Sequence, residues 1–161
     1  MLYNKALHFL SFRPRSEKEI RQYLIKKIPK PKSQTIIDTK DQETIEAIII
    51  KLKSYKFVDD IEFARWWIEQ RTRIKPRALK FIKFELKQKG ITQETIDAVT
   101  LDDQFQKTSD IDLALKLAQK RIERLRNETP QKRFEKMFRY LSAKGFDYNT
   151  IKQVIDRILS K

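Results

Sequence analysis

Apolar residues recur at intervals of three and four along several short stretches of the chain, and this spacing predicts amphipathic helices. The clearest stripe contains Leu79, Ile82 and Leu86, and Ile20 with Leu24 repeats its spacing. The remaining stripes are Phe134, Met137 and Leu141, then Ile45, Ile48, Ile49 and Leu52, and finally Ile151, Val154, Ile155 and Ile158. Each stripe is expected to face a hydrophobic core, so the chain is predicted to be all-α.

One phrase occurs three times in the chain. It reads "DQETIEAIII" at 41–50, "ITQETIDAV" at 91–99 and "FDYNTIKQVI" at 146–155. In every copy a Thr-Ile pair follows an earlier helix that contains a leucine and has a basic end. Such repetition predicts a row of small modules in place of one compact domain.

A further element precedes each of these pairs of helices. "DIEFARWWI" at 60–68 matches "DIDLALKLA" at 110–118, and "KALHFL" at 5–10 is a shortened version. Each repeat is therefore predicted to hold three helices, arranged like a helix-turn-helix unit. Because a unit of this size buries little surface alone, the repeats are expected to pack in tandem into an elongated, curved array. The predicted modules span 1–57, 58–105 and 106–161.

The first repeat is longer than the other two because it contains "PKPKSQTIIDTK" at 29–40. Two prolines, two positions apart, stop the preceding helix, and the polar residues after them have no helical period. This stretch is predicted to be an inserted loop.

Two expected helix starts carry the spacing of a capping box. In this motif a side-chain oxygen accepts an early backbone NH, and a carboxylate three residues later reaches back. Ser16 and Glu19 have this spacing, and Asp59 with Glu62 repeats it. Helix starts are thus predicted at both positions.

Proline and glycine mark other helix ends. Thr129 followed by Pro130 is typical of an N-cap with proline at the first helical position. Gly90 and Gly145, the two glycines of the chain, directly follow the second helices of the second and third repeats. A left-handed residue is favoured there, so neither glycine is assigned to a phosphate-binding loop.

Composition excludes several kinds of chemistry. The chain of 161 residues is 40% hydrophobic and 36% charged, and it contains no cysteine. Disulfides and thiolate zinc sites are therefore excluded, and the single histidine, His8, is interpreted as a helix-face residue without a chemical role. We expect no catalytic residue, no metal and no cofactor. The absence of a long apolar run predicts no membrane association and a cytoplasmic protein.

Positive charge is concentrated in three windows of the chain. The formal net charge is +14, and the basic windows are 13–32, 65–89 and 116–144. Each window covers the first and second helices of a repeat, whereas acidic residues gather at the starts of third helices. A basic face that recurs along an elongated array is typical of a protein that follows a phosphate backbone. Acidic residues at the starts of the third helices of modules one and two disfavour a sequence-specific major-groove reader.

These windows supply the predicted contact residues for nucleic acid or a nucleoprotein filament. The central group is Arg71, Arg73, Arg77, Lys80, Lys83 and Lys87, and the flanking group is Arg13, Arg15, Arg21, Arg133 and Arg139. Aromatic residues leave alternatives open. Trp66 is either a contact for a base or a partner protein, or a residue packed against a neighbouring module. Phe81 and Phe84 have the same two interpretations.

Four segments resemble the RecX family of regulatory proteins. They are "ALHFLSFRPRSEKEIRQYLIKK" at 6–27, "SYKFVDDIEFARWWIEQR" at 54–71, "KPRALKFIKFELKQKGITQETIDAV" at 75–99 and "RYLSAKGFDYNTIKQVI" at 139–155. The most specific features are an aspartate pair, a Phe-Ala pair and an arginine, followed in order by Glu-Leu and Lys-Gly-Ile. The resemblance extends over nearly the whole chain.

The resemblance implies a protein that binds the RecA recombinase and its filament on single-stranded DNA. It implies inhibition or modulation of the recombinase, ATPase and coprotease activities of RecA in DNA repair and the SOS response. Double-stranded DNA is a second candidate ligand, and a monomer is expected. A general, non-sequence-specific nucleic-acid-binding protein is the alternative, because the basic faces alone suffice for it. An enzyme built on Asp59-Asp60 or Asp102-Asp103 is disfavoured, because caps at helix starts explain clustered carboxylates.

The chain departs from the family pattern at two places. Ile74 and Lys75 stand where many members have a glycine before the proline that starts the second helix of module two, and Pro76 lies about one turn further from Leu86 than in those members. The predicted loop at 29–40 is also unusual. Both departures are expected to affect how the protein meets a filament more than how its core packs.

Overall fold

The computed structural model describes residues 1–28, 38–101 and 108–159, and every regular element in these ranges is a helix. Module one comprises α1 (Leu2–Ser11), α2 (Glu17–Lys27) and α3 (Thr39–Ser54). Module two comprises α4 (Asp60–Glu69), the π-helical turn η1 (Gln70–Ile74), α5 (Leu79–Gln88) and α6 (Gln93–Thr100). Module three comprises α8 (Asp110–Ile122), the 3-10 turn η2 (Glu123–Leu125), α9 (Pro130–Ser142) and α10 (Tyr148–Leu159).

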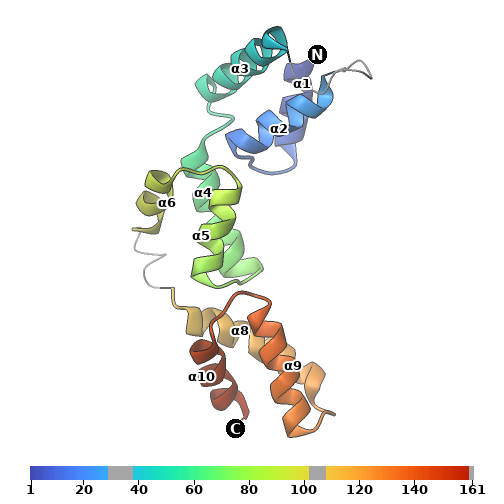
Figure 1. Cartoon of the computed structure of the whole chain (residues 1–161), viewed down its shortest axis with the longest axis vertical. Helices are drawn as coiled ribbons and strands as arrows, with labels where there is room; N and C mark the ends of the chain where they lie inside the picture. Colours follow the sequence, from blue (N-terminus) through green and yellow to red (C-terminus); the bar gives the residue numbers. More distant parts are fainter. Residues whose placement is uncertain (29–37, 102–107, 160–161) are drawn as a thin grey trace.

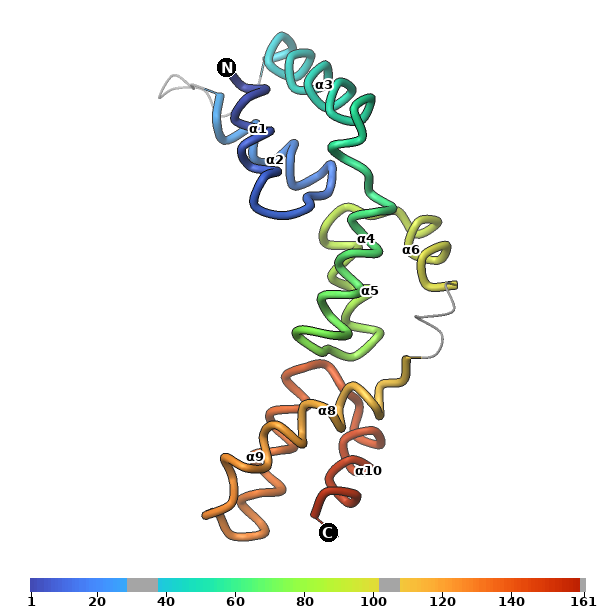
Figure 2. The backbone as a smooth tube through the Cα atoms, turned by 180° about the vertical axis from the view of Figure 1, so that it is seen from behind, coloured from blue at the N-terminus to red at the C-terminus, as the bar shows by residue number. Residues whose placement is uncertain are grey.

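The modules follow one another along the long axis of a bent, elongated molecule (Figure 1). Seen from behind, α6 and α10 lie toward the outer side of the bend (Figure 2). The segment that joins α4 to α5 and the helix α9 lie toward its inner side in both views. The predicted all-α, curved array of three-helix repeats is therefore confirmed.

Each module has its own hydrophobic core. The leucines that recur in the second helices, Leu24, Leu86 and Leu141, are completely buried in three separate clusters. The isoleucines of the repeated Thr-Ile pairs are buried in the same clusters. Phe134 was expected in the third core, but this prediction is wrong, because 37% of the residue is exposed. It is the fifth residue of α9.

One prediction about module one requires correction. Most of the predicted loop at 29–40 lies outside the described residues, but Thr39 and Lys40 form the first turn of α3. Asp38 caps this helix by accepting the backbone NH of Asp41 at 2.7 Å. The first helix of module one is short, as predicted: α1 has ten residues, whereas α8 has thirteen and α4 continues directly into η1.

The predicted N-caps are present. Ser16 Oγ accepts the NH of Glu19 at 3.2 Å, and Asp59 Oδ1 accepts the NH of Glu62 at 3.1 Å. The carboxylates of these two boxes do not reach back to the cap, however. Glu19 and Glu62 instead pair with cations, which are stronger partners for a carboxylate than a backbone amide. Pro130 occupies the first position of α9, as predicted.

Modules one and two meet where α2 begins. The NH of Glu17, the first residue of α2, donates to Asp60 Oδ1 at 2.8 Å. The hydroxyl of Ser16 donates to the carbonyl of Lys89 at 2.7 Å. An amide at a helix start has no partner within its own helix, so the next module satisfies it.

Modules two and three meet in the same way where α5 begins. The NH of Leu79, the first residue of α5, donates to Asp110 Oδ1 at 2.7 Å. The NH of Ala78 donates to the carbonyl of Lys144 at 3.2 Å. In both junctions, the aspartate that begins the first helix of one module holds the second helix of the preceding module. The carbonyl before the glycine of the later module makes a second bond to the same helix start. Ala78 is also part of the core of module three, so this junction has an apolar face as well.

Both glycines lie at these junctions in the left-handed conformation. Gly90 has a φ of +84° and Gly145 a φ of +91°, as predicted for helix C-terminal glycines. A Cβ atom at Gly90 would lie 2.7 Å from side-chain carbons of Lys18, and one at Gly145 would lie 3.0 Å from Phe81. Glycine is thus required by the close approach of the preceding module as well as by the backbone.

Replacing Gly90 with alanine should destabilise the protein by about 1–3 kcal/mol, because alanine is strained at positive φ and its Cβ meets Lys18. Urea unfolding followed by circular dichroism measures this change. Gln88→Ala, at the exposed last residue of the preceding helix α5, is the matched control and should change stability little. Equal stability of the two variants would show that the junction tolerates a side chain at Gly90.

Candidate nucleic-acid interface

Two predicted contact arginines converge on one carboxylate in module two. Arg71 Nε donates to Glu85 Oε2 at 2.7 Å, and Arg77 Nε lies 3.3 Å from Glu85 Oε1. Trp67 Nε1 also donates to Glu85 Oε2, at 2.9 Å. The side chain of Glu85 is only 14% exposed. Glu85 therefore anchors both arginines through their inner nitrogens.

Local backbone structure brings these two arginines together. Arg71 belongs to η1, after which the chain turns back toward α5. The NH of Arg77 donates to the carbonyl of Arg71 at 3.1 Å, and that of Lys75 donates to the carbonyl of Gln70 at 2.9 Å. The departure from the family pattern at Ile74 and Lys75 thus lies within this turn, beside the two arginines.

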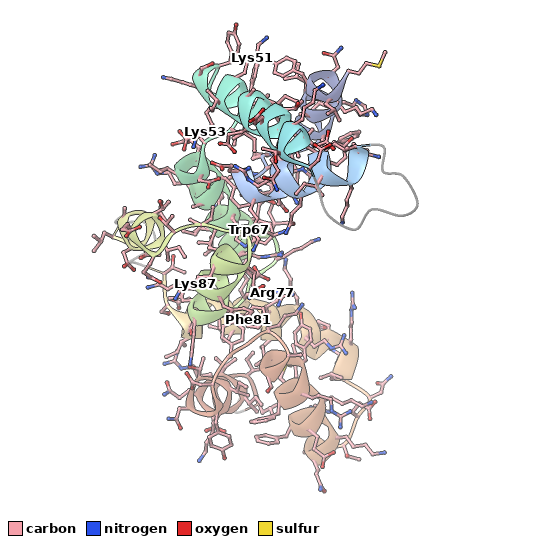
Figure 3. The ribbon with its side chains drawn as sticks, turned by 45° about the horizontal axis from the view of Figure 1, so that its top comes forward. Lys51, Lys53, Trp67, Arg77, Phe81 and Lys87 are labelled. Atoms are coloured by element: carbon pink, nitrogen blue, oxygen red, sulfur yellow. The ribbon has the colours of Figure 1, made fainter. Side chains whose placement is uncertain are left out.

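Aromatic rings orient both guanidinium groups. Arg71 Cζ lies 4.5 Å from the centre of the Trp67 ring, and Arg77 Cζ lies 4.8 Å from that of Phe81. Figure 3 shows Arg77 and Phe81 together at the module-three end of α5. Such stacking restricts a guanidinium group without neutralising it. Phe81 packs against the core of module three, which supports its interpretation as a core residue, whereas Phe84 is 53% exposed.

Arg13 is engaged at the junction of modules one and two. Its two terminal nitrogens donate to the two oxygens of Glu19, at 3.1 and 2.9 Å, and Lys89 Nζ donates to the same carboxylate at 2.6 Å. Burial alone would raise the pKa of Glu19. The hydrogen bonds from Arg13 and Lys89 outweigh this effect, so the pKa of Glu19 is lowered.

Trp66 lies close to both modules at this junction. Its ring is 5.9 Å from Phe63 and 6.0 Å from Trp67, and the guanidinium of Arg13 lies 5.7 Å from its centre. Trp66 is partly buried against the core of module two. Packing between modules therefore accounts for its position.

The other predicted residues of module one also have protein partners. Arg15 lies over the ring of Phe9 at 3.8 Å, and burial, together with the nearby charge of Arg13, lowers the pKa of Arg15. Arg21 pairs with Glu17 at 2.9 Å and with Glu46 at 2.8 Å. Lys53, labelled on α3 in Figure 3, also pairs with Glu17, at 3.0 Å.

The remaining predicted residues are mostly at the surface. Arg133 donates to the carbonyls of Glu128 and Arg126, so it supports the turn before α9. Arg73, whose side chain is 67% exposed, makes a surface ion pair with Glu69. The side chains of Lys80, Lys87 and Arg139 are also exposed, whereas that of Lys83 is half-buried. The structure thus separates arginines that hold the fold together from cations that solvent can reach.

The clustered acids have structural roles in the described part of the chain. Asp59 caps α4, and Asp60 binds module one. Burial raises the pKa of Asp60, and the NH of Glu17 partly offsets this effect. The pair Asp102-Asp103 lies outside the described residues. Residues 1–28, 38–101 and 108–159 contain no group of three His, Asp or Glu side chains that could hold a metal ion, and no helix among them is long and apolar enough to cross a bilayer.

The fold and these surfaces define an all-α protein of tandem three-helix repeats with polar junctions and exposed basic residues. Family models for RecX match all three modules: the first three-helix domain at 3–38, the second at 59–99 and the third at 108–155. The chain belongs to the RecX family.

Proteins named regulatory protein RecX are similar to the chain over almost its full length. That of Clostridioides difficile strain 630 is 32% identical over 157 residues, which are 98% of this chain and 68% of the relative. The RecX protein of Prosthecochloris aestuarii is 31% identical to this chain, and the matched region makes up 93% of the length of that relative. The Oceanobacillus iheyensis protein is 33% identical over 160 residues, but the chain spans only 53% of it.

Crystal structures of RecX proteins have the same fold. RecX from Lactobacillus salivarius superposes with a TM-score of 0.64 at 24% identity, over 99% of this chain and 96% of that one. A second structure of regulatory protein RecX gives a TM-score of 0.66 at 28% identity, over 96% of this chain and 71% of that one.

Replacing Glu19 with glutamine should destabilise the protein at neutral pH by about 2 kcal/mol, because Arg13 and Lys89 lose a charged partner. A carboxyl group whose pKa is lowered by folding contributes stability above its unfolded pKa, and this contribution disappears as the pH falls through the folded pKa. The difference from the wild type should therefore shrink below about pH 4.3, the ordinary pKa of glutamate. Unfolding measured from pH 7 to 3 tests this. A difference that does not change with pH would contradict the ion-pair origin.

Proposed function

We propose that the protein binds the filament that RecA forms on single-stranded DNA and restrains its recombinase, ATPase and coprotease activities. Family membership and the basic side chains along the elongated array support this proposal. The exposed cations Arg73 and Lys80 belong to module two, and η1, which carries Arg73, lies on the inner side of the bend (Figure 2). A curved molecule can lie along a polymer and contact several of its subunits at once.

The proposed mechanism is electrostatic and steric, without catalysis by this chain. Basic side chains contact strand phosphates, and the rigid modules bridge neighbouring RecA subunits. Bridged subunits turn over slowly, so substoichiometric protein should suppress ATP hydrolysis by RecA on single-stranded DNA. An unchanged hydrolysis rate at equimolar protein would remove the proposal. Binding to naked DNA without any effect on RecA would favour a general nucleic-acid-binding protein.

Reversing two exposed charges, Arg73→Glu with Lys80→Glu, should weaken binding to RecA filaments about tenfold, equivalent to about 1.4 kcal/mol. Fold stability should change little, because exposed charges contribute little to it. Filament cosedimentation measures the affinity, and circular dichroism checks the fold. Lys26→Glu with Lys152→Glu makes the same change of charge at exposed positions of modules one and three. Equal weakening in both variants would indicate that only net charge matters.

A further inference from the structure

A basic cavity lies between modules two and three. Its volume is about 280 Å³, and residues from η1, the segment before α5, α8 and α9 line it, together with Lys144 just beyond α9. None of its lining residues is acidic. The cationic lining residues are Arg71, Lys75, Arg77, Lys116, Lys120 and Lys144. Six cations around one small space repel one another, so the cavity strongly favours an anion.

Glu85 fixes the orientation of the two arginines that line this cavity. It engages Arg71 and Arg77 through Nε, so within the described part of the chain their terminal nitrogens have no hydrogen-bond acceptor. Trp67 and Phe81 hold the two guanidinium planes. The outer edge of a guanidinium group is the edge that binds phosphate in bidentate fashion. Both arginines are therefore preorganised, which lowers the entropic cost of binding.

The opposite wall comes from module three. Lys116 Nζ donates to the carbonyl of Arg73 at 2.9 Å, which holds α8 against η1. Lys144 Nζ lies 5.6 Å from the centre of the Tyr140 ring. Lys75 and Lys120 are exposed and make no hydrogen bond or ion pair to any described residue, so their ammonium groups can turn toward a ligand.

We infer that this cavity binds a backbone phosphate of a nucleic-acid strand. Two guanidinium groups anchored by Glu85, and the ammonium groups of Lys75 and Lys120, supply positive charge and hydrogen-bond donors for the oxygens of a phosphate. The turn that carries Arg71 lies on the inner side of the bend, where Arg73 is exposed, so a strand that follows this side passes the cavity (Figures 1 and 2). Because both modules contribute cations, the bound phosphate bridges them. The inference rests on the proposed function only in assigning the strand to a RecA filament.

The two exposed lysines provide the first test. Lys75→Ala with Lys120→Ala should weaken binding of the full chain to an oligo-dT strand on the order of tenfold. The slope of log affinity against log salt should become shallower by about 0.7, the value for one lost phosphate contact on a single strand. The control variant, Lys5→Ala with Lys26→Ala, removes the same charge from exposed positions of module one. It should change neither the affinity for the strand nor the salt slope. Equal losses in the two variants, measured by fluorescence anisotropy, would overturn the inference.

A second test separates a built site from general attraction. Glu85→Gln removes a negative charge, so general attraction alone predicts tighter binding. Loss of the anchor for Arg71 and Arg77 predicts the opposite, with binding several-fold weaker and a shallower salt slope. Glu69→Gln makes the same charge change beside the exposed Arg73 and should leave binding equal or slightly tighter. Tighter binding by a folded Glu85→Gln variant would overturn the inference. If this variant does not fold, the binding measurements on Lys75→Ala with Lys120→Ala decide.

Small phosphate compounds are the alternative ligands for this cavity, because they present the same phosphate oxygens as a strand. Pyrophosphate and ATP are titrated against the isotope-labelled chain while the amide signals of Ala78 and Lys144 are followed. Oligo-dT should shift these signals at lower concentration than either compound and should displace both. If pyrophosphate or ATP binds there and oligo-dT does not compete, the strand assignment is overturned. Lysine-dependent strand binding without any effect on RecA would uphold the cavity and refute the proposed function.

Discussion

The hydrogen bond between the start of a helix in one module and an aspartate in the next is the interaction on which the form of the molecule depends. Asp60 holds α2, and Asp110 holds α5 in the same manner. Each module has its own small core, so the bend of the array is determined at these junctions. A directional bond to a single amide fixes an orientation more closely than apolar contact does, because hydrogen bonds weaken steeply with angle.

Two largely buried glutamates in this basic protein place cations. Glu19 gathers Arg13 and Lys89 at the first junction, and Glu85 gathers Arg71 and Arg77 near the second. The basic surface is therefore not a uniform layer of charge. Some of its arginines pair with buried carboxylates, some also stack on aromatic rings, and others are exposed to solvent.

Local chemistry in the sequence was sufficient to predict the repeats, the caps and the glycines. The caps formed by Ser16 and Asp59 and the left-handed backbone of Gly90 depend on neighbours within a few residues, so these local roles can be predicted from spacing. The role of Glu85 could not be predicted, because its partners Arg71 and Arg77 come together only through the π-helical turn. The sequence likewise contains no sign that Lys18 would approach Gly90, since this contact joins two modules.

The proline at the start of α9 has a consequence for the length of the array. Glu17 and Leu79, which open α2 and α5, each give their amide hydrogen to the following module. Pro130 occupies the equivalent place in α9, and proline has no amide hydrogen to give. A fourth unit of the same kind would find no donor there, so the series of carboxylate bonds stops at the third repeat, whatever follows it in the chain.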